Sequence, residues 1–255
     1  MYHIEVNHLT RSFGHNKVLD DISLRVDEGE FFGLFGSNGA GKTTLLRILT
    51  GQLSADSGSV LTAGIPISNP IGIKTAIGIV PEAETPPTFL TAREALELTC
   101  RIRGLSEIPT KVDHWLRFFD VESQSDVLCR DLSKGQRQKI MLASAFIHEP
   151  HLLLLDEAFI NLDPIYQRRL REYLSELHKE GRTIFLCTHI LEIAERMCDR
   201  VGIIDHGKLI RVGTINELRK EAQSGSSLED IFLELTGKTQ DQEIAQFLDD
   251  VTNHS

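Results

Sequence analysis

The hydrophobic pattern of the first 30 residues alternates with the period of two that is typical of β-strands. Residues 2–6 and 18–26 carry this alternation, and the turn-like segment FGHNK lies between them. The pattern therefore predicts an antiparallel β layer at the start of the chain.

A different succession of elements begins at residue 31. The apolar segment 31–36 runs into a glycine-rich loop, and apolar residues then recur at helical spacing over 42–51. Strand signals return at 151–157, 182–189 and 200–205, and a helical pattern over 166–181 separates the first two. This alternation predicts an α/β core.

The stretch 84–150 lacks strand patterning. It opens with Pro86, Pro87 and a capping box from Thr91 to Glu94, and helical patterns occupy 92–105 and 111–120. We therefore expect a helical lobe inserted into the core. The predicted division is 1–83 with 151–215 as core and β layer, 84–150 as lobe, and 216–255 as a C-terminal helical extension.

Two amphipathic helices are predicted in that extension, with apolar residues at i, i+3, i+4 and i+7. The apolar positions are Leu228, Ile231, Phe232 and Leu235 in the first, and Ile244, Phe247, Leu248 and Val251 in the second. Packing on their own subunit is the favoured interpretation, and a surface for a partner or a second copy is the alternative.

The composition is that of a globular protein, with 41% hydrophobic and 25% charged residues among 255. The N-terminus lacks a basic and apolar leader, and every apolar run is too short for a membrane span. We expect a cytoplasmic chain. A formal net charge of -10 argues against a general nucleic-acid surface, so no nucleic-acid partner is expected.

Cysteine and histidine positions predict no metal centre of their own. The four cysteines lack CxxC spacing, so neither a zinc site nor a disulfide framework is indicated. The histidines form no H-E-x-x-H or comparable cluster.

The glycine-rich loop matches G-x-x-x-x-G-K-[ST], the phosphate-binding P-loop, and lies between a predicted strand and a predicted helix. Glycines let backbone N–H groups approach phosphates, the helix N-terminus favours anions, and Lys42 brings a charge to the β- and γ-phosphates. Thr43 offers a hydroxyl to Mg²⁺. The predicted nucleotide-binding residues are Gly36, Ser37, Asn38, Gly39, Ala40, Gly41, Lys42, Thr43 and Thr44.

A second motif, HLLLLDE, ends a buried strand with Asp156 and Glu157. In an open parallel sheet this position lies beside the phosphate loop. Asp156 is therefore predicted to hold Mg²⁺, and Glu157 to polarise the attacking water. Such strands are common, so the assignment depends on the accompanying P-loop.

The segment LSKGQ, residues 132–136, precedes this acidic strand by about 20 residues and is followed by a helical pattern. It resembles the signature motif of ATP-binding-cassette (ABC) ATPases. The resemblance implies a P-loop NTPase (RecA-like) core, and a signature turn that caps the γ-phosphate held by a second subunit. Ser133, Gly135 and Gln136 would serve this contact, although Ser133 is equally suited to a plain helix N-cap.

Further matches follow the family's order along most of the chain. The resemblance implies that Phe13 stacks on adenine, with a core role as the alternative. The segment INLDP, which contains Asp163, resembles the D-loop that passes between the two nucleotide sites. The alternative is an ordinary Asp-Pro turn. His189 resembles the switch histidine that contacts the γ-phosphate, whereas taken alone it would be read as a helix cap.

Four positions depart from the family pattern. Glu82 stands where the family usually has Gln, and a carboxylate there can still ligate Mg²⁺. Lys134 replaces a common Gly in the signature, and Ala158 replaces a Pro after the acidic pair. Lys139 replaces a frequent Arg, which would alter an ion pair.

The resemblance implies an ATP-hydrolysing subunit of an ABC transporter that drives a separate transmembrane permease by ATP-dependent dimer closure. Residues 189–214 and 227–237 resemble ATPase subunits of ABC-2 type exporters, so we expect an exporter on the inner face of the cell membrane. The second ATPase subunit would be a second copy or a close relative. The alternative is a soluble ABC-family ATPase acting on ribosomes or DNA.

Overall fold

The computed structural model describes residues 1–82, 85–221 and 231–232, and the first of its two sheets forms an outer β layer. Its strands are β1 (Tyr2–Phe13), β2 (Asn16–Asp27), β4 (Ser57–Thr62) and β5 (Ile65–Pro66), in the order β2-β1-β4-β5. All pairs are antiparallel. The alternating pattern therefore predicted the antiparallel pair β1 and β2 correctly, and the structure adds β4 and β5 to this layer.

The second sheet has six strands in the order β10-β9-β3-β8-β7-β6. They are β3 (Phe31–Phe35), β6 (Ile77–Val80), β7 (Leu152–Asp156), β8 (Thr183–Thr188), β9 (Arg200–Asp205) and β10 (Lys208–Thr214). All neighbours are parallel except β10, which runs antiparallel to β9. Because β3, β7 and β8 are buried along their whole length, they read as continuous apolar runs.

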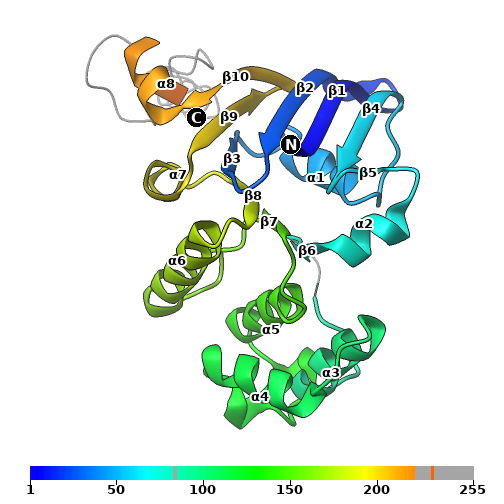
Figure 1. Ribbon diagram of the computed structural model, residues 1–255, viewed down its shortest axis with the longest axis vertical. Helices are drawn as coiled ribbons and strands as arrows, with labels where there is room; N and C mark the ends of the chain where they lie inside the picture. The colour runs from blue at the N-terminus through cyan, green and yellow to red at the C-terminus, as the bar shows by residue number, and fades with distance from the viewer. Residues whose placement is uncertain (83–84, 222–230, 233–255) are drawn as a thin grey trace, which may run out of the picture.

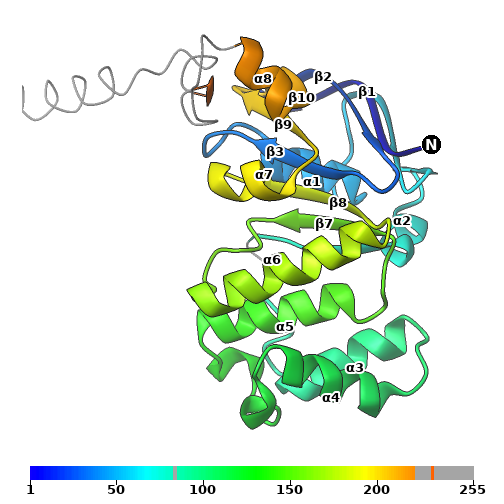
Figure 2. The same ribbon diagram turned by 60° about the vertical axis from the view of Figure 1, so that its left-hand side comes forward.

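Helices cover this sheet on both faces (Figures 1 and 2). Helix α1 (Lys42–Leu49) packs between the two sheets, where Leu46 and Leu49 join a core with Leu24 and Leu154. The remaining helices of this part are α2 (Pro70–Ala76), α6 (Pro164–Lys179), α7 (Leu191–Met197) and α8 (Ile215–Glu221).

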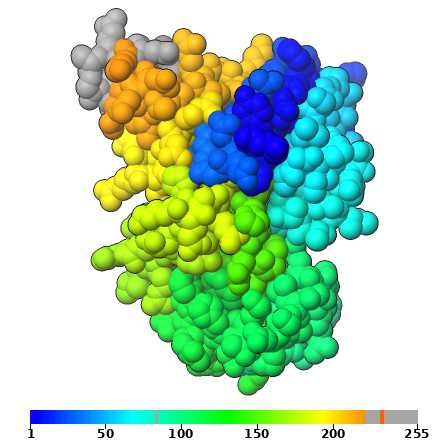
Figure 3. All heavy atoms as spheres, viewed as in Figure 1, coloured from blue at the N-terminus to red at the C-terminus, as the bar shows by residue number. Residues whose placement is uncertain are grey.

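A helical lobe lies between β6 and β7 in the chain and forms one end of the molecule (Figure 3). It contains α3 (Ala92–Ile102), α4 (Ile108–Phe118), α5 (Lys134–Phe146) and two short 3₁₀ helices, Glu122–Gln124 and Cys129–Asp131. The predicted capping box is present, because Glu94 N donates to Thr91 Oγ1 at 3.1 Å and Thr91 N donates to Glu94 Oε2 at 2.8 Å. The α/β fold class with an inserted helical lobe is confirmed.

Aromatic side chains join the lobe to the rest of the protein. The Trp115 ring of α4 lies 5.6 Å from Phe146 of α5 and 5.5 Å from Tyr173 of α6, centroid to centroid. Phe146 and Tyr173 are 5.1 Å apart, which closes the triangle. Since α6 packs on the sheet, these contacts hold the lobe against the core.

Only part of the predicted C-terminal extension can be compared with the structure. The second amphipathic helix, with Ile244, Phe247, Leu248 and Val251, lies outside the described residues, as do Leu228 and Leu235. Ile231 is 1% exposed and packs with Phe35 and Leu218 of the same chain. That contact agrees with packing on its own subunit at this position.

The sequence patterns missed several elements, among them β4, β5, α2, β10 and the two 3₁₀ helices. Strands β5 and β10 lie at sheet edges, and α2 has seven residues. Short or edge elements bury little apolar surface, so their hydrophobic periodicity is weak.

The aromatic contacts predict that Phe146→Ala loosens the lobe. Removal of this fully buried ring should lower the free energy of unfolding by about 3–5 kcal/mol. Denaturant unfolding followed by fluorescence of Trp115, the chain's single tryptophan, measures the change. Ile102→Ala, at a position of the same lobe that is 74% exposed, is the matched control. Equal effects of the two substitutions would contradict the assigned role of Phe146.

Candidate functional site

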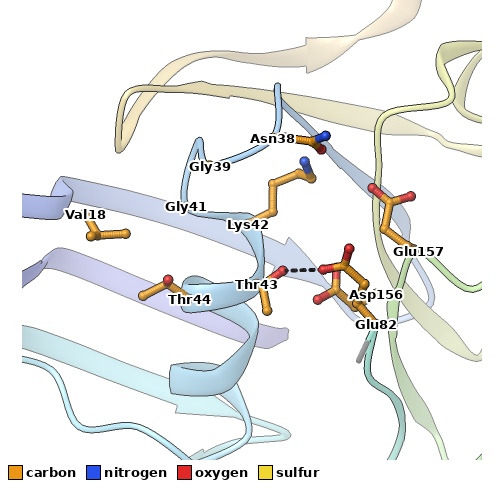
Figure 4. Close-up of a pocket in the computed structure, with 10 residues that line it drawn as sticks. All are labelled: Val18, Asn38, Gly39, Gly41, Lys42, Thr43, Thr44, Glu82, Asp156 and Glu157. Atoms are coloured by element: carbon orange, nitrogen blue, oxygen red, sulfur yellow. Dashed lines mark hydrogen bonds between the residues drawn. The ribbon is translucent and has the colours of Figure 1, made fainter. Parts of the chain in front are cut away.

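Four loops meet at one edge of the six-stranded sheet, because β3, β8, β7 and β6 are parallel neighbours and end on the same side. A pocket of about 380 Å³ opens there (Figure 4). Its lining includes nine predicted site residues and one that was missed, Val18 of β2. These residues are Val18, Asn38, Gly39, Gly41, Lys42, Thr43, Thr44, Glu82, Asp156 and Glu157.

The P-loop has a backbone that only glycine can supply at key positions. Gly41 has a φ of 111° and Gly39 a φ of 80°, values that L side chains rarely adopt. A Cβ on Gly36 would lie 2.4 Å from Ile204 O, and one on Gly41 would lie 2.8 Å from Leu19 Cδ2. The glycines therefore allow both the turn and the close approach of neighbouring backbone.

Lys42 is folded back over this loop at the N-terminus of α1. Its residue is only 6% exposed, and its Nζ donates to Gly36 O at 2.7 Å and to Ser37 O at 3.2 Å. An ammonium held by two carbonyl oxygens at a helix N-terminus, beside exposed loop N–H groups, forms an anion-binding concavity.

Asp156 and Glu82 both face Thr43 in the pocket (Figure 4). It is 1% exposed, and neither carboxylate oxygen has a hydrogen-bond partner among the described residues. Thr43 Oγ1 donates to Glu82 Oε2 at 3.4 Å. Burial raises the pKa of Asp156 to about 6, and the charges of Glu82 and Glu157 act in the same direction.

This donor set fits a hard cation that also takes ligands from a bound phosphate. An unpartnered buried carboxylate, a second carboxylate and a hydroxyl converge there, all with oxygen donors. Among the described residues, no group of three or more His, Cys, Asp or Glu side chains is arranged to hold a metal by itself. Any ion here would therefore depend on phosphate or water oxygens as well.

Glu157 is held firmly beside the loop. Its backbone has a φ of 50°, and its N–H donates to Cys187 O at 2.9 Å. The carboxylate accepts from Thr188 Oγ1 at 3.0 Å and contacts His189 Nδ1 at 2.9 Å. An oriented, nearly buried carboxylate that opens into the pocket can accept a proton from a water there.

His189 does not cap a helix. The N-cap residue of α7 is Ile190, and it makes no side-chain cap bond, so the reading of His189 as a plain cap is wrong. Its side chain is half exposed and meets Glu157 from the end of the neighbouring strand β8.

The signature residues lie away from their own P-loop, and none of them lines the pocket. Ser133 caps α5, because Gln136 N donates to Ser133 Oγ at 3.2 Å and Ser133 N donates to Gln136 Oε1 at 2.9 Å. A Cβ on Gly135 would lie 2.7 Å from Asn161 O, so glycine allows the loop before α6 to approach. Asp163 caps α6 by accepting from Ile165 N at 3.1 Å.

Phe13 stands at the end of β1, paired with Asn16 at the hairpin turn. Its residue is 49% exposed, so the alternative of a core role is wrong. It does not line the pocket itself, but the same hairpin places Val18 there.

The turn between β9 and β10 supports the P-loop from behind and was not identified from the sequence. Gly207 N donates to Ala40 O at 3.1 Å, and Ser37 Oγ donates to Asp205 Oδ1 at 3.4 Å. Gly207 has a φ of 76°, and a Cβ there would lie 2.4 Å from Val18 O. The Asp-His-Gly turn signal was the one available clue to this contact.

The departures from the family pattern fit their surroundings. Lys139 is 9% exposed, and its Nζ lies 3.0 Å from the centroid of the Tyr166 ring, so a cation–π contact stands where an altered ion pair was expected. Ala158 is fully buried, and its carbonyl accepts from Gln138 Nε2 at 3.2 Å. Lys134 begins α5 on the exposed surface.

Comparison with known proteins agrees with this geometry. The family model described as "ABC transporter" matches residues 19–160. An uncharacterized ABC transporter ATP-binding protein of Methanocaldococcus jannaschii is 40% identical over 84% of this chain and 79% of its own length. Nod factor export ATP-binding protein I of Sinorhizobium fredii is 37% identical over 90% of this chain and 67% of its own. EcsA, an ABC-type transporter ATP-binding protein of Bacillus subtilis, is 35% identical over 91% and 96%.

A solved ATP-binding subunit of an ABC transporter superposes with a TM-score of 0.85 and 34% identity, covering 91% of this chain and 99% of its own. A dimeric ATP-binding cassette in a post-hydrolysis state, at 23% identity and a TM-score of 0.76, shares the fold. The chain therefore belongs to the ABC transporter ATP-binding proteins. As in that family, it is a nucleotide-binding ATPase subunit of a transporter.

The raised pKa of Asp156 predicts a pH-dependent cost to stability. The folded state binds this proton more tightly than the unfolded chain, in which the pKa is near 3.8, so stability is lost as the pH rises from about 4 through about 6 and levels off at higher pH. Asp156→Asn should therefore stabilise the nucleotide-free protein in chelator by about 2–3 kcal/mol at pH 7.5, and by about half as much at pH 5.

Thermal unfolding at the two pH values measures this difference. Asp126→Asn, at an exposed position of the lobe, is the control and should change neither value. An equal gain at both pH values would show that the stabilisation does not come from the buried charge.

Proposed function

We propose that this chain is the ATPase subunit of an exporter, and that two such subunits close around two ATP molecules to drive a separate transmembrane permease. Its similarity to several Nod factor export ATP-binding proteins supports export as the direction of transport. No described helix is both long enough and apolar enough to cross a membrane. The permease would hold the chain at the inner face of the cell membrane.

The observation that carries the two-subunit proposal is the separation of the signature turn from its own phosphate pocket. Ser133 and Gly135 begin α5 on the lobe, and neither residue lines that pocket. A helix N-terminus with Ser and Gly favours an anion, and the γ-phosphate of a second subunit supplies one. Asp163, at the start of α6 next to this turn, would lie between the two sites.

Nucleotide binding would use the loop from Gly36 to Thr44. Its N–H groups and the N-terminus of α1 would hold the phosphates, and Lys42 would turn its Nζ from Gly36 O toward the β- and γ-phosphates. Phe13 would stack on the adenine. Thr43, Asp156 and Glu82 would hold Mg²⁺, which supplies charge neutralisation at the phosphate oxygens.

Hydrolysis would begin at Glu157. Its carboxylate would take a proton from a water whose oxygen attacks the γ-phosphorus, while the bond to the β–γ bridging oxygen breaks and ADP leaves with that oxygen. Thr188 and His189 hold this carboxylate at 3.0 and 2.9 Å, which orients it before the nucleotide arrives. Because Nδ1 of His189 contacts Glu157, Nε2 of the same ring would be the nitrogen that contacts the γ-phosphate.

The docking surface for the permease is proposed near the start of α3. Phe89 is 75% exposed, and Ile102 at the other end of the helix is 74% exposed. Leu90 is instead packed against the lobe core. A short cytoplasmic helix of the permease would bury Phe89 together with the apolar side chains of α3.

Glu157→Gln should abolish turnover while leaving ATP binding intact. Loss of the proton acceptor predicts a fall in kcat of at least about a hundredfold. ATP should then trap the closed dimer, which size-exclusion chromatography with multi-angle light scattering detects. Glu180→Gln, at the exposed end of α6, is the control and should hydrolyse ATP normally without trapping a dimer. A variant that keeps its turnover would remove Glu157 from the mechanism.

Affinity purification from gently solubilised native membranes tests the transporter assignment. We expect a stoichiometric partner with several membrane spans, identified by mass spectrometry. Phe89→Asp, which places a charge on the proposed docking surface, should release that partner while the purified subunit still binds ATP. Recovery of the chain only in the soluble fraction, with ribosomal or DNA-repair proteins, would overturn the proposal.

A further inference from the structure

An arginine lies against the proposed adenine-stacking ring. The guanidinium carbon of Arg11 is 4.8 Å from the centroid of the Phe13 ring, within the range of a cation–π contact. Both residues belong to β1, close to the hairpin turn that brings Val18 to the nucleotide pocket. None of the sequence patterns pointed to Arg11.

Asp56 holds the guanidinium in place. Arg11 Nη1 donates to Asp56 Oδ1 at 2.8 Å, and Ser12 N donates to Asp56 Oδ2 at 2.6 Å. The backbone of Asp56 is itself tied to β1, because its N–H donates to Thr10 O at 2.9 Å. Three hydrogen bonds with three consecutive β1 residues therefore fix Asp56, two at its carboxylate and one at its backbone N–H, and Asp56 in turn fixes one arginine.

The hydrogen bonding of Arg11 is incomplete. Its side chain is 19% exposed, and its Nε is buried with no partner among the described residues. A buried donor without a partner is unfavourable, so hydrogen bonding alone does not account for this placement. The contact with Phe13 and the ion pair with Asp56 are the interactions that hold the guanidinium against the ring.

We propose that Arg11 is a positioning residue for the nucleotide base: it covers one face of the Phe13 ring, so that the opposite face receives the adenine of ATP. The half-exposed state of Phe13 leaves room for that second contact. A ring packed on one side cannot rotate freely, and stacking then needs less ordering of the side chain. The inference rests on the proposed role of Phe13.

The experiment compares Arg11→Ala, Arg11→Lys, Phe13→Ala and the double Arg11→Ala/Phe13→Ala variant in the full-length protein. Binding of ATP and of inorganic tripolyphosphate, which lacks the base, is measured by calorimetry with Mg²⁺. Arg25→Ala is the matched control. Arg25 lies 5.0 Å from the Tyr2 ring and pairs with Glu5 at 3.0 Å in the same two strands, away from the nucleotide pocket.

Phe13→Ala should weaken ATP binding about tenfold and Arg11→Ala about threefold, because one removes the stacking partner and the other only its support. Tripolyphosphate binding should change in neither. The double variant should bind ATP no more weakly than Phe13→Ala, since Arg11 acts through the ring. Arg11→Lys should recover part of the loss, and Arg25→Ala should behave as the unmodified protein.

Three results would overturn the inference while leaving Phe13 in its role. In the first, Arg11→Ala binds ATP with the same affinity as Arg25→Ala. In the second, Arg11→Ala loses affinity for ATP and for tripolyphosphate equally. In the third, Arg11→Ala binds ATP more tightly than the unmodified protein. The last would show that the guanidinium covers the face that the base needs. Normal ATP binding by Phe13→Ala would instead overturn the adenine-stacking proposal and, with it, this inference.

Discussion

Parallel pairing of β3, β8, β7 and β6 is the constraint on which the site depends. Neighbouring parallel strands end at the same edge, so the segments that follow them must meet there. The P-loop follows β3, His189 follows β8, Asp156 and Glu157 end β7, and Glu82 follows β6. The P-loop, Glu82, Asp156 and Glu157 therefore line one pocket of about 380 Å³, and His189 contacts Glu157 from the end of the neighbouring strand. The segment after β3 supplies the phosphate loop, the segment after β8 supplies an imidazole, and the ends of β7 and β6 supply carboxylates.

Close backbone approach is the second condition for this pocket. Gly36 and Gly41 let the P-loop touch Ile204 and Leu19, and Gly207 lets the β9–β10 turn touch Val18. The outer β layer, the central sheet and the phosphate loop are thus in contact through positions where a single methyl group would collide with its neighbours. The same principle operates at Gly135, which admits Asn161 O beside the signature turn. Glycine serves here to join elements as well as to expose N–H groups.

Electrostatics divides the pocket into two halves. Lys42 and the N-terminus of α1 favour anions on one side, while Glu82, Asp156 and Glu157 gather negative charge on the other. Burial raises the pKa of Asp156, because its charged carboxylate loses hydration, and a nearby cation or a bound proton would offset this cost. A nucleotide bound together with a divalent cation would satisfy both halves at once. The pocket therefore suits a ligand that carries both negative and positive charge.

The sequence by itself determined the β1–β2 pair, the α/β core, the capping box from Thr91 to Glu94 and the identity of the loop and acidic motifs, because period, turn chemistry and short motifs are local properties. It also indicated the family, through the order of motifs along the chain. Only the tertiary structure decided which groups meet: the contact of Glu157 with His189, the support of the P-loop by Asp205 and Gly207, and the placement of Arg11 on Phe13. It also showed Lys139 on the Tyr166 ring in place of an altered ion pair. These contacts join residues whose separation along the chain carries no local signal, and packing of whole elements brings them together.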